Sequence, residues 1–153
     1  MVVALAVSAA LGLWRLATDG RFGAGRRGGG REPDVAAHAQ DVRPSDAPAP
    51  GAELVSRLGG TLGERATLLQ FSSAFCAPCR ATRRVLAEVS GLVDGVAHVE
   101  VDAEQHLDAT RAFAVLRTPT TVVLDARGVE VTRAAGAPTK AQVLSALAGA
   151  NLT

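Results

Sequence analysis

The only two cysteines of the 153-residue chain, Cys76 and Cys79, stand three positions apart. An apolar run at residues 68–71, Leu-Leu-Gln-Phe, precedes them and has the length and character of a buried strand. A helical pattern follows them, and one of its faces carries Cys79, Thr82, Leu86 and Val89. A Cys-x-x-Cys pair between a strand and the start of a helix favours a redox-active dithiol.

The predicted helix start gives the two thiols different roles. The first turn of a helix carries unpaired N–H groups and the positive end of the dipole, and both favour a thiolate. We therefore expect the pKa of the Cys76 thiol to fall below the ordinary value of about 8.5. Pro78 lies in the same turn, where its missing N–H has no cost. Cys76, nearer the surface, is predicted to attack, and Cys79, one turn deeper, to resolve the product.

Two other interpretations of the cysteine pair stay open at this point. A purely structural disulfide is possible, although a bridge that closes so short a loop gains little from chain entropy. A closed zinc site needs four ligands. The three histidines, His38, His98 and His106, have no spacing that would complete such a site, so zinc would require a dimer.

Three segments resemble the thioredoxin family. Residues 75–80, Phe-Cys-Ala-Pro-Cys-Arg, are similar to the family's active site, with Phe75 where Trp is usual and Ala77 where Gly is usual. Residues 115–120, Val-Leu-Arg-Thr-Pro-Thr, resemble the segment that ends in the family's cis-proline. Residues 136–151 resemble its last turn and C-terminal helix.

The resemblance covers residues 67–152 and implies a function as well as a fold. It implies a thiol–disulfide oxidoreductase in which the Cys76 thiolate attacks a substrate disulfide and Cys79 releases the mixed disulfide. No metal or organic cofactor is implied. The partners would be substrate proteins that carry disulfides and an external reductant or reductase that recycles the dithiol.

Thr118 and Pro119 are the predicted substrate-binding residues. Pro119 begins a strand that should be central in the sheet, where proline is normally excluded. A cis bond would place it at the strand edge facing the dithiol. The resemblance implies that Thr118 offers backbone hydrogen bonds to the bound substrate. An ordinary trans-proline at a strand start is the alternative.

Two positions depart from the family pattern near the dithiol. Gln70 stands where the family usually has a buried Asp, and His98 stands where it usually has a Lys. An amide cannot take up the proton of the resolving thiol. We therefore expect Cys79 to lose its proton through water or another group. His98 is expected to be a half-buried strand residue rather than a proton carrier.

The elements of residues 52–153 follow the order βαβαββα, which predicts parallel pairing in the first part of the sheet and an antiparallel hairpin at the end. The resemblance implies that they form an α/β three-layer sandwich of the thioredoxin type. A hairpin at Ala126-Arg127-Gly128 and a capping box at Thr139 and Gln142 are expected. Residues 52–62 fit a helical turn or an outer strand. Strands are expected at 66–71, 96–101, 120–125 and 129–133, and helices at 76–90, 104–115 and 140–148.

The N-terminal part differs in composition from the rest. Residues 1–17 are apolar apart from Ser8 and Arg15 and are predicted to be a membrane anchor, with a cleaved signal or a docked apolar tail as alternatives. Residues 18–51, first basic and then rich in Pro and Ala, are predicted to be a disordered linker. Basic residues follow the apolar run and none precedes it, which predicts a cytoplasmic catalytic domain.

The predicted function is therefore that of a membrane-tethered, monomeric thiol–disulfide oxidoreductase that acts as a reductant. The net charge of only +1 and the lack of regular aromatic interleaving among the N-terminal arginines argue against nucleic-acid binding. Two alternatives stay open. The domain could be exported and reduce extracytoplasmic proteins, or it could be a binding module that uses the Thr118-Pro119 groove without catalysis.

Overall fold

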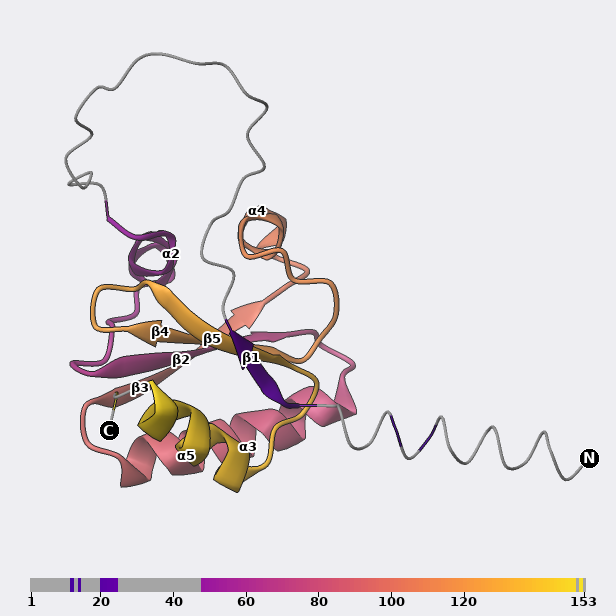
Figure 1. The fold of residues 1–153 in the computed structure, drawn as a ribbon. Coiled ribbons are helices and arrows are strands. Elements are labelled where there is room, and N and C mark those ends of the chain that lie inside the picture. Colours follow the sequence, from indigo (N-terminus) through magenta and orange to yellow (C-terminus); the bar gives the residue numbers. More distant parts are fainter. Residues whose placement is uncertain (1–11, 13, 15–19, 25–47, 151, 153) are drawn as a thin grey trace, which may run out of the picture.

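A five-stranded sheet in the order β1-β5-β4-β2-β3 runs through the computed structural model (Figure 1), which describes residues 12, 14, 20–24, 48–150 and 152. β2 pairs with β3 in parallel, and the other pairings are antiparallel. The strands are β1 (Phe22–Ala24), β2 (Ala66–Ser72), β3 (Val96–Asp102), β4 (Thr120–Asp125) and β5 (Glu130–Ala135).

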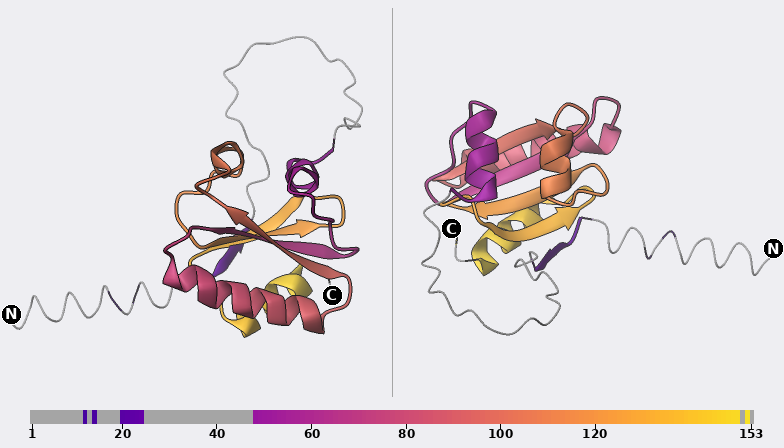
Figure 2. Two further views of the ribbon diagram at one scale, coloured as in Figure 1. Left: turned by 180° about the vertical axis from the view of Figure 1, so that it is seen from behind. Right: turned by 90° about the horizontal axis from the view of Figure 1, so that it is seen from above.

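Helices cover both faces of the sheet. One face carries α2 (Pro50–Arg57) and α4 (Leu107–Ala112), and the other carries α3 (Ala77–Leu92) and α5 (Lys140–Gly149), as both views in Figure 2 show. Alternate residues of each strand point to opposite faces, so the sheet supports two separate apolar cores. Leu69, Phe71 and Val122 belong to the first core, and Leu68 and Val123 to the second. The predicted α/β three-layer architecture is confirmed.

Several predicted local signals are present with their expected geometry. The Asp125–Gly128 turn closes the β4–β5 hairpin, and the Gly128 φ of +81° explains why glycine stands there. Thr139 and Gln142 form the reciprocal capping box at the start of α5. The segment at 52–62, for which a helical turn or an outer strand was expected, begins within the helix α2. Leu54 and Val55 bury one side of this helix against the sheet.

Some predicted boundaries are wrong. The helix α4 spans only Leu107–Ala112, whereas residues 104–115 were expected to be helical. The Asp102 carboxylate accepts the Glu104 N–H at 2.9 Å and holds the preceding residues in a turn. Ala114 has a φ of +48°, which ends the helix on its other side. The last strand is shifted to Glu130–Ala135, because β4 continues to pair with it up to Ala135.

The strand β1 lies inside the segment predicted to be a linker. Phe22 pairs with Ala134 and Ala24 with Thr132, and the Thr132 hydroxyl donates to the Gly23 carbonyl at 2.5 Å. Residues 18–51 are therefore not a linker throughout, because Phe22–Ala24 extend the sheet and α2 begins at Pro50. A three-residue strand is too short to show the alternation of apolar residues by which strands are predicted.

The predicted anchor at residues 1–17 lies outside the described residues except for Gly12 and Trp14, both helical. Within the described part of the chain, we find no helix with both the length and the apolar character required to cross a bilayer.

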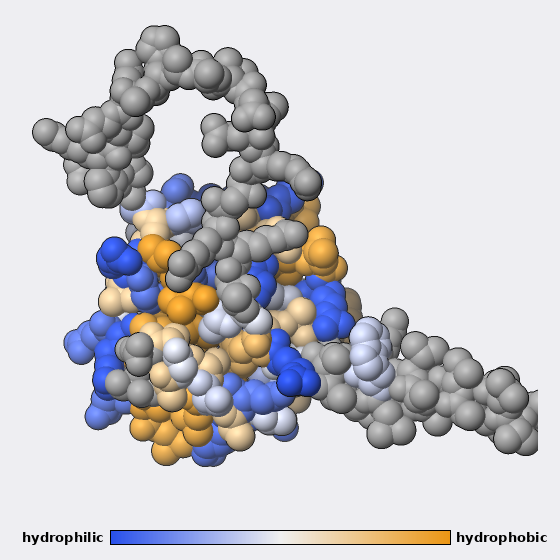
Figure 3. Space-filling model, in the orientation of Figure 1, coloured by the Kyte–Doolittle hydropathy of each residue, from blue (hydrophilic) through white to orange (hydrophobic). Residues whose placement is uncertain are grey.

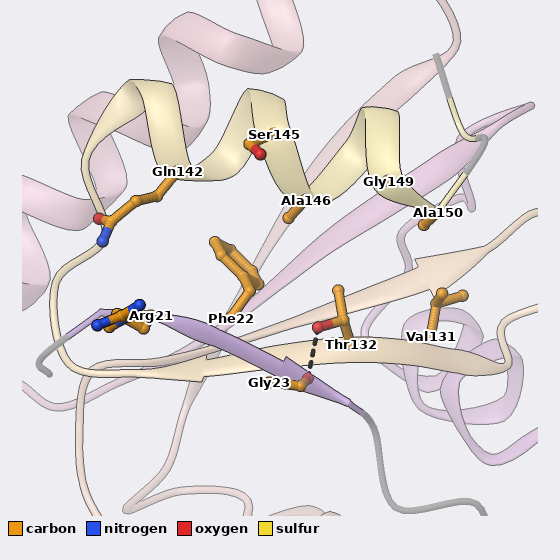
Figure 4. Close-up of a pocket in the computed structure, with 10 residues that line it drawn as sticks. All are labelled: Arg21, Phe22, Gly23, Val131, Thr132, Gln142, Ser145, Ala146, Gly149 and Ala150. Carbon is orange, nitrogen blue, oxygen red and sulfur yellow. Dashed lines mark hydrogen bonds between the residues drawn. The ribbon is translucent and has the colours of Figure 1, made fainter.

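A cavity of about 630 Å³ separates α5 from β1 and β5. Phe22 and Ala146 face each other across it, and neither cysteine lines it (Figure 4). On the face shown in Figure 3, apolar residues gather over α5, where Ala141 and Ala148 are exposed. The dithiol, at the start of α3 on the same face of the sheet, is not part of the lining of this cavity.

Candidate active site

The dithiol lies where β2 ends and α3 begins, and the two cysteines form a disulfide with a Cα–Cα distance of 5.2 Å. Cys76 is the N-cap of α3, which therefore begins at Ala77, one residue later than predicted. Its Sγ accepts the Cys79 N–H at 3.1 Å. Because this N–H is one of the unpaired donors of the first turn, the cap places the Cys76 sulfur where a thiolate is stabilised.

Exposure differs sharply between the two sulfur-bearing residues. Cys76 is half-buried, whereas Cys79 is 1% exposed and packs on the sheet side of α3. The predicted difference in depth is confirmed, and it fits an attacking Cys76 and a resolving Cys79. Phe75 beside them is 98% exposed, and Ala77 and Pro78 are also exposed. An apolar side chain held in solvent next to a reactive sulfur is suited to contact with another protein.

Thr118 and Pro119 are joined by a cis peptide bond, as predicted. The Thr118 hydroxyl lies 3.3 Å from the Ser73 hydroxyl, so the loop before β4 touches the segment that leads into the dithiol. The Pro119 carbonyl accepts the Gly136 N–H at 2.7 Å. The role of Thr118 in binding substrate stays a prediction. Leu116 in the same loop is 96% exposed.

Gln70 is fully buried and connects β2, β3 and α3. Its amide nitrogen donates to the Ser72 hydroxyl at 2.7 Å and to the Cys79 carbonyl at 3.0 Å. Its carbonyl oxygen lies 3.1 Å from the His98 Nε2, which must be the donor because the amide oxygen only accepts. Gln70 thus fixes the backbone of Cys79 and offers no base for its thiol.

Arg83 and Glu100 form an ion pair beside the hydrogen bonds of Gln70. The Arg83 Nε lies 2.6 Å from the Glu100 Oε2, and the Arg83 Nη2 lies 2.7 Å from the Glu100 Oε1, a bidentate arrangement. Burial by itself would raise the pKa of the Glu100 carboxyl, but hydrogen bonds from Arg83 and Ser72 outweigh burial and lower it. The same contacts raise the pKa of Arg83. Both groups are therefore charged at neutral pH.

Burial, reinforced by the positive charge of Arg83, lowers the pKa of His98 below its ordinary value, against the opposing effect of Glu100. His98 is half-buried, as expected for a strand residue. The imidazole is accordingly neutral at neutral pH and donates to Gln70.

We expect acidification to destabilise the domain through His98. The unfolded histidine titrates near pH 6.5. Because the folded pKa is lower, the unfolded state binds more protons as pH falls through this value, and stability is lost. Thermal melts at about pH 7.5 and 5.5 should show a larger drop in Tm for the wild type than for His98→Gln. Equal drops in both proteins would contradict this assignment.

A cavity of about 350 Å³ opens between the dithiol and the ion pair. Arg80, from the motif at residues 75–80, lines it together with Cys79. Sequence reasoning did not identify the other polar residues of the lining: Ser72, Ser73, Arg83, Glu100 and Asp102. The alternation of His98, Glu100 and Asp102 on β3 was an available signal, since it places three polar residues on the α3 face. Among the described residues, no cluster of three or more His, Cys, Asp and Glu could hold a metal ion.

The comparisons with known proteins agree on one family. The sequence model of the thioredoxin family, described as "Thioredoxin", matches residues 61–149. The chain is 34% identical over 70 residues to Thioredoxin H2-1 of Oryza sativa subsp. japonica. That match covers 46% of this chain and 50% of the relative, so the chain spans about half the length of the curated relative it matches.

Solved structures show the same fold. Chloroplastic thioredoxin z superposes with a TM-score of 0.54 at 20% identity, over 67% of this chain and 87% of that chain. Fasciola hepatica thioredoxin superposes with a TM-score of 0.52 at 23% identity, over 63% and 88% of the two chains. The family model covers the dithiol and the Thr118-Pro119 loop but not β1, which is a further element of this chain.

Proposed function

The chain belongs to the thioredoxin family, and on this premise we propose that it is a thiol–disulfide oxidoreductase that reduces disulfides of substrate proteins. The observation that carries the proposal is the Cys76–Cys79 disulfide, with the more exposed sulfur at the start of α3 and the other beneath it. The exposed Phe75 and Leu116 support a protein as the substrate.

The reaction transfers two electrons. The Cys76 thiolate attacks one sulfur of the substrate disulfide, forms a mixed disulfide and expels the other substrate sulfur as a thiolate. The Cys79 thiol then loses its proton and attacks Cys76. The Cys76–Cys79 bond forms, the second substrate sulfur leaves as a thiolate, and the substrate is reduced. A dithiol reductant must afterwards return the protein to its reduced form.

Reduction of insulin disulfides in the presence of dithiothreitol tests the proposal. We expect turnover by the wild type well above the rate of dithiothreitol alone. A binding module that uses the Thr118-Pro119 groove without catalysis would leave the insulin reduction rate at the level of dithiothreitol alone. Ser145→Ala serves as a matched control, because Ser145 lines the cavity between α5 and β1, away from the cysteines.

We further propose that residues 1–17 anchor the protein in a membrane and that the catalytic domain faces the cytoplasm. The support lies in the sequence, where the apolar segment contains Arg15 near its end and is followed by Arg21, Arg26, Arg27 and Arg31. In a reducing cytoplasm the dithiol would act as a reductant. On the opposite side of the membrane the same chemistry would serve extracytoplasmic proteins.

The position at which β1 begins determines how far the dithiol would lie from the membrane. The Gly20 N–H donates to the Ala135 carbonyl at 3.0 Å, and the adjacent Gly136 N–H donates to the Pro119 carbonyl at 2.7 Å. β1 therefore begins at the dithiol end of the sheet, near the start of α3 (Figure 1). The stretch from residue 17 to Gly20 reaches at most about 10 Å. An anchor at residues 1–17 would hold the dithiol close to the bilayer, where disulfides near the membrane surface are the accessible substrates.

Labelling of intact cells tests the proposed side of the membrane. A membrane-impermeant maleimide is expected to leave Cys76 unmodified in intact, reduced cells and to modify it after lysis. The Cys76→Ser protein is the control for specificity, because Cys79 is buried. Labelling of Cys76 in intact cells would contradict the cytoplasmic placement and favour an exported reductase.

A further inference from the structure

In the part of the chain that the structure describes, the resolving thiol has no proton acceptor among its direct partners. Cys79 is 1% exposed, and the amide of Gln70 contacts its carbonyl oxygen rather than offering a base. The thiol must nevertheless lose its proton before or during the attack on Cys76, because the thiolate is the nucleophile. Among the cavities found within the described residues, Cys79 lines the one of about 350 Å³. This cavity opens toward solvent.

We propose that Glu100 is the proton acceptor for Cys79, reached through water in this cavity. Glu100 and Cys79 line the same cavity, one from β3 and the other from α3. A volume of about 350 Å³ holds several water molecules at roughly 30 Å³ each. The inference rests on the proposed thiol–disulfide exchange and names the group that this chain uses in its second step.

The contacts of Glu100 hold its carboxylate ready for this role. Arg83 binds it in a bidentate pair from α3, and Ser72 donates to it from β2. The remaining charged groups around the cavity are Asp102 on β3 and Arg80 on α3, and His98 lies two residues from Glu100 on the same face of β3. Asp102 is turned to its own loop, where it accepts from the Glu104 N–H and from Gln105. His98 directs its Nε2 to Gln70. Glu100 is therefore the carboxylate best placed for the thiol.

The transfer of a proton from Cys79 to Glu100 is unfavourable, but it is fast enough for enzymatic turnover. A thiol and a carboxyl ordinarily differ by about four pKa units. A step that is unfavourable by a factor of about 10⁴ still has a ceiling of about 6 × 10⁸ per second, far above the turnover of ordinary enzymes at about 10 per second. Each unit by which Arg83 lowers the pKa of Glu100 reduces that ceiling about tenfold, which leaves the route open.

Electrons and protons balance in this step. The S–H proton of Cys79 passes through water to the Glu100 carboxylate while the sulfur electron pair attacks Cys76. The bond between Cys76 and the substrate sulfur breaks, and that sulfur leaves with its electron pair as a thiolate. Glu100 then returns the proton to bulk solvent through the mouth of the cavity.

The test uses the reduced protein mixed in stopped flow with one equivalent of dithiobis(nitrobenzoate). The first release of coloured thiolate reports attack by Cys76, and the second reports resolution by Cys79. In the wild type we expect a resolution rate that changes little between about pH 6 and 8, because Glu100 stays ionised. Glu100→Gln should resolve at least about tenfold more slowly at pH 7. Its rate should then rise about tenfold per pH unit, as expected when hydroxide takes the proton.

Two further variants separate proton acceptance from structure. Arg83→Gln removes the same ion pair but keeps the carboxylate, so it should retain the flat pH profile. Glu104→Gln removes an exposed carboxylate outside the cavity and should behave as the wild type. Equal slowing of resolution in Glu100→Gln and Arg83→Gln would overturn the role of Glu100 but not the proposed function. An unchanged pH dependence of the resolution rate in Glu100→Gln would do the same. A wild type that never resolves the adduct would overturn the proposed function with it.

Discussion

Cys79→Ser is expected to turn the protein into a trap for its substrates. Cys76 keeps its place at the start of α3 and still attacks a disulfide, but the group that would release the mixed disulfide is gone. Cys76→Ser leaves only the buried Cys79 and should form no such adducts. Both variants are expected to lose insulin reduction essentially completely, the largest change in activity predicted for any substitution in this chain.

The measurement is capture of mixed disulfides from cells after acid quenching, with separation on non-reducing gels. Adducts that vanish with dithiothreitol are expected for Cys79→Ser and not for Cys76→Ser or the double variant. Mass spectrometry of the trapped peptides should locate the bond at Cys76 and identify the substrates. Equal trapping by both single variants, or faster alkylation of Cys79 than of Cys76 at neutral pH, would reverse the assigned roles.

The different depths of the two cysteines follow from local sequence, which explains why they could be predicted. Cys79 shares a helical face with Thr82, Leu86 and Val89, and all four are buried. The hairpin at Gly128 and the capping box at Thr139 are also set by neighbouring residues. Such signals act within one turn or one strand, so no knowledge of the folded chain is needed to recognise them.

The parts that could not be predicted depend on residues far apart in the sequence. β1 is stable only because Phe22–Ala24 meet β5 more than a hundred positions later, and three residues carry no periodic signal. The pair of Arg83 and Glu100 joins α3 to β3 across 17 positions. Neither residue belongs to the Cys-Ala-Pro-Cys motif, and only the packing of α3 on the sheet brings them beside Cys79.

Gln70, which stands where the family usually has a buried Asp, affects both the stability of the domain and the chemistry of Cys79. A carboxylate at this position would replace an amide that donates to two buried acceptors, the Ser72 hydroxyl and the Cys79 carbonyl. Gln70→Asp removes both donors and places an ionisable group where exposure is 0%. Burial raises the pKa of such a carboxyl. The folded state then binds more protons than the unfolded state above about pH 4, so the loss of stability grows as pH rises.

Gln70→Asp is therefore expected to lose about 2–4 kcal/mol of folding stability near pH 8. For a domain of this size, that corresponds to a decrease in Tm of roughly 10–20 °C. Thermal melts at about pH 5 and 8 should show the larger decrease at the higher pH. Gln70→Asn is the matched control, because it shortens the side chain equally without adding a charge, and its decrease should not depend on pH.

The same substitution should accelerate release of the mixed disulfide. An aspartate at position 70 can take up a proton, which the amide cannot do, and it would lie in the layer of polar side chains beside Cys79. We expect Gln70→Asp to resolve the Cys76 adduct faster than the wild type above neutral pH, while Gln70→Asn shows no gain. Unchanged decay between about pH 6 and 9 would show that position 70 does not govern the Cys79 proton in this chain.

Combining Gln70→Asp with Glu100→Gln tests whether the two positions serve the same proton. If Glu100 is the acceptor in the wild type, a carboxyl at position 70 should restore much of the resolution rate that Glu100→Gln loses. The two effects would then be strongly non-additive in a double-mutant cycle. If the effects simply add, the two side chains act independently on the site, and the slowing in Glu100→Gln has another origin. The cycle needs only the two thiolate-release phases, measured at one pH for four proteins.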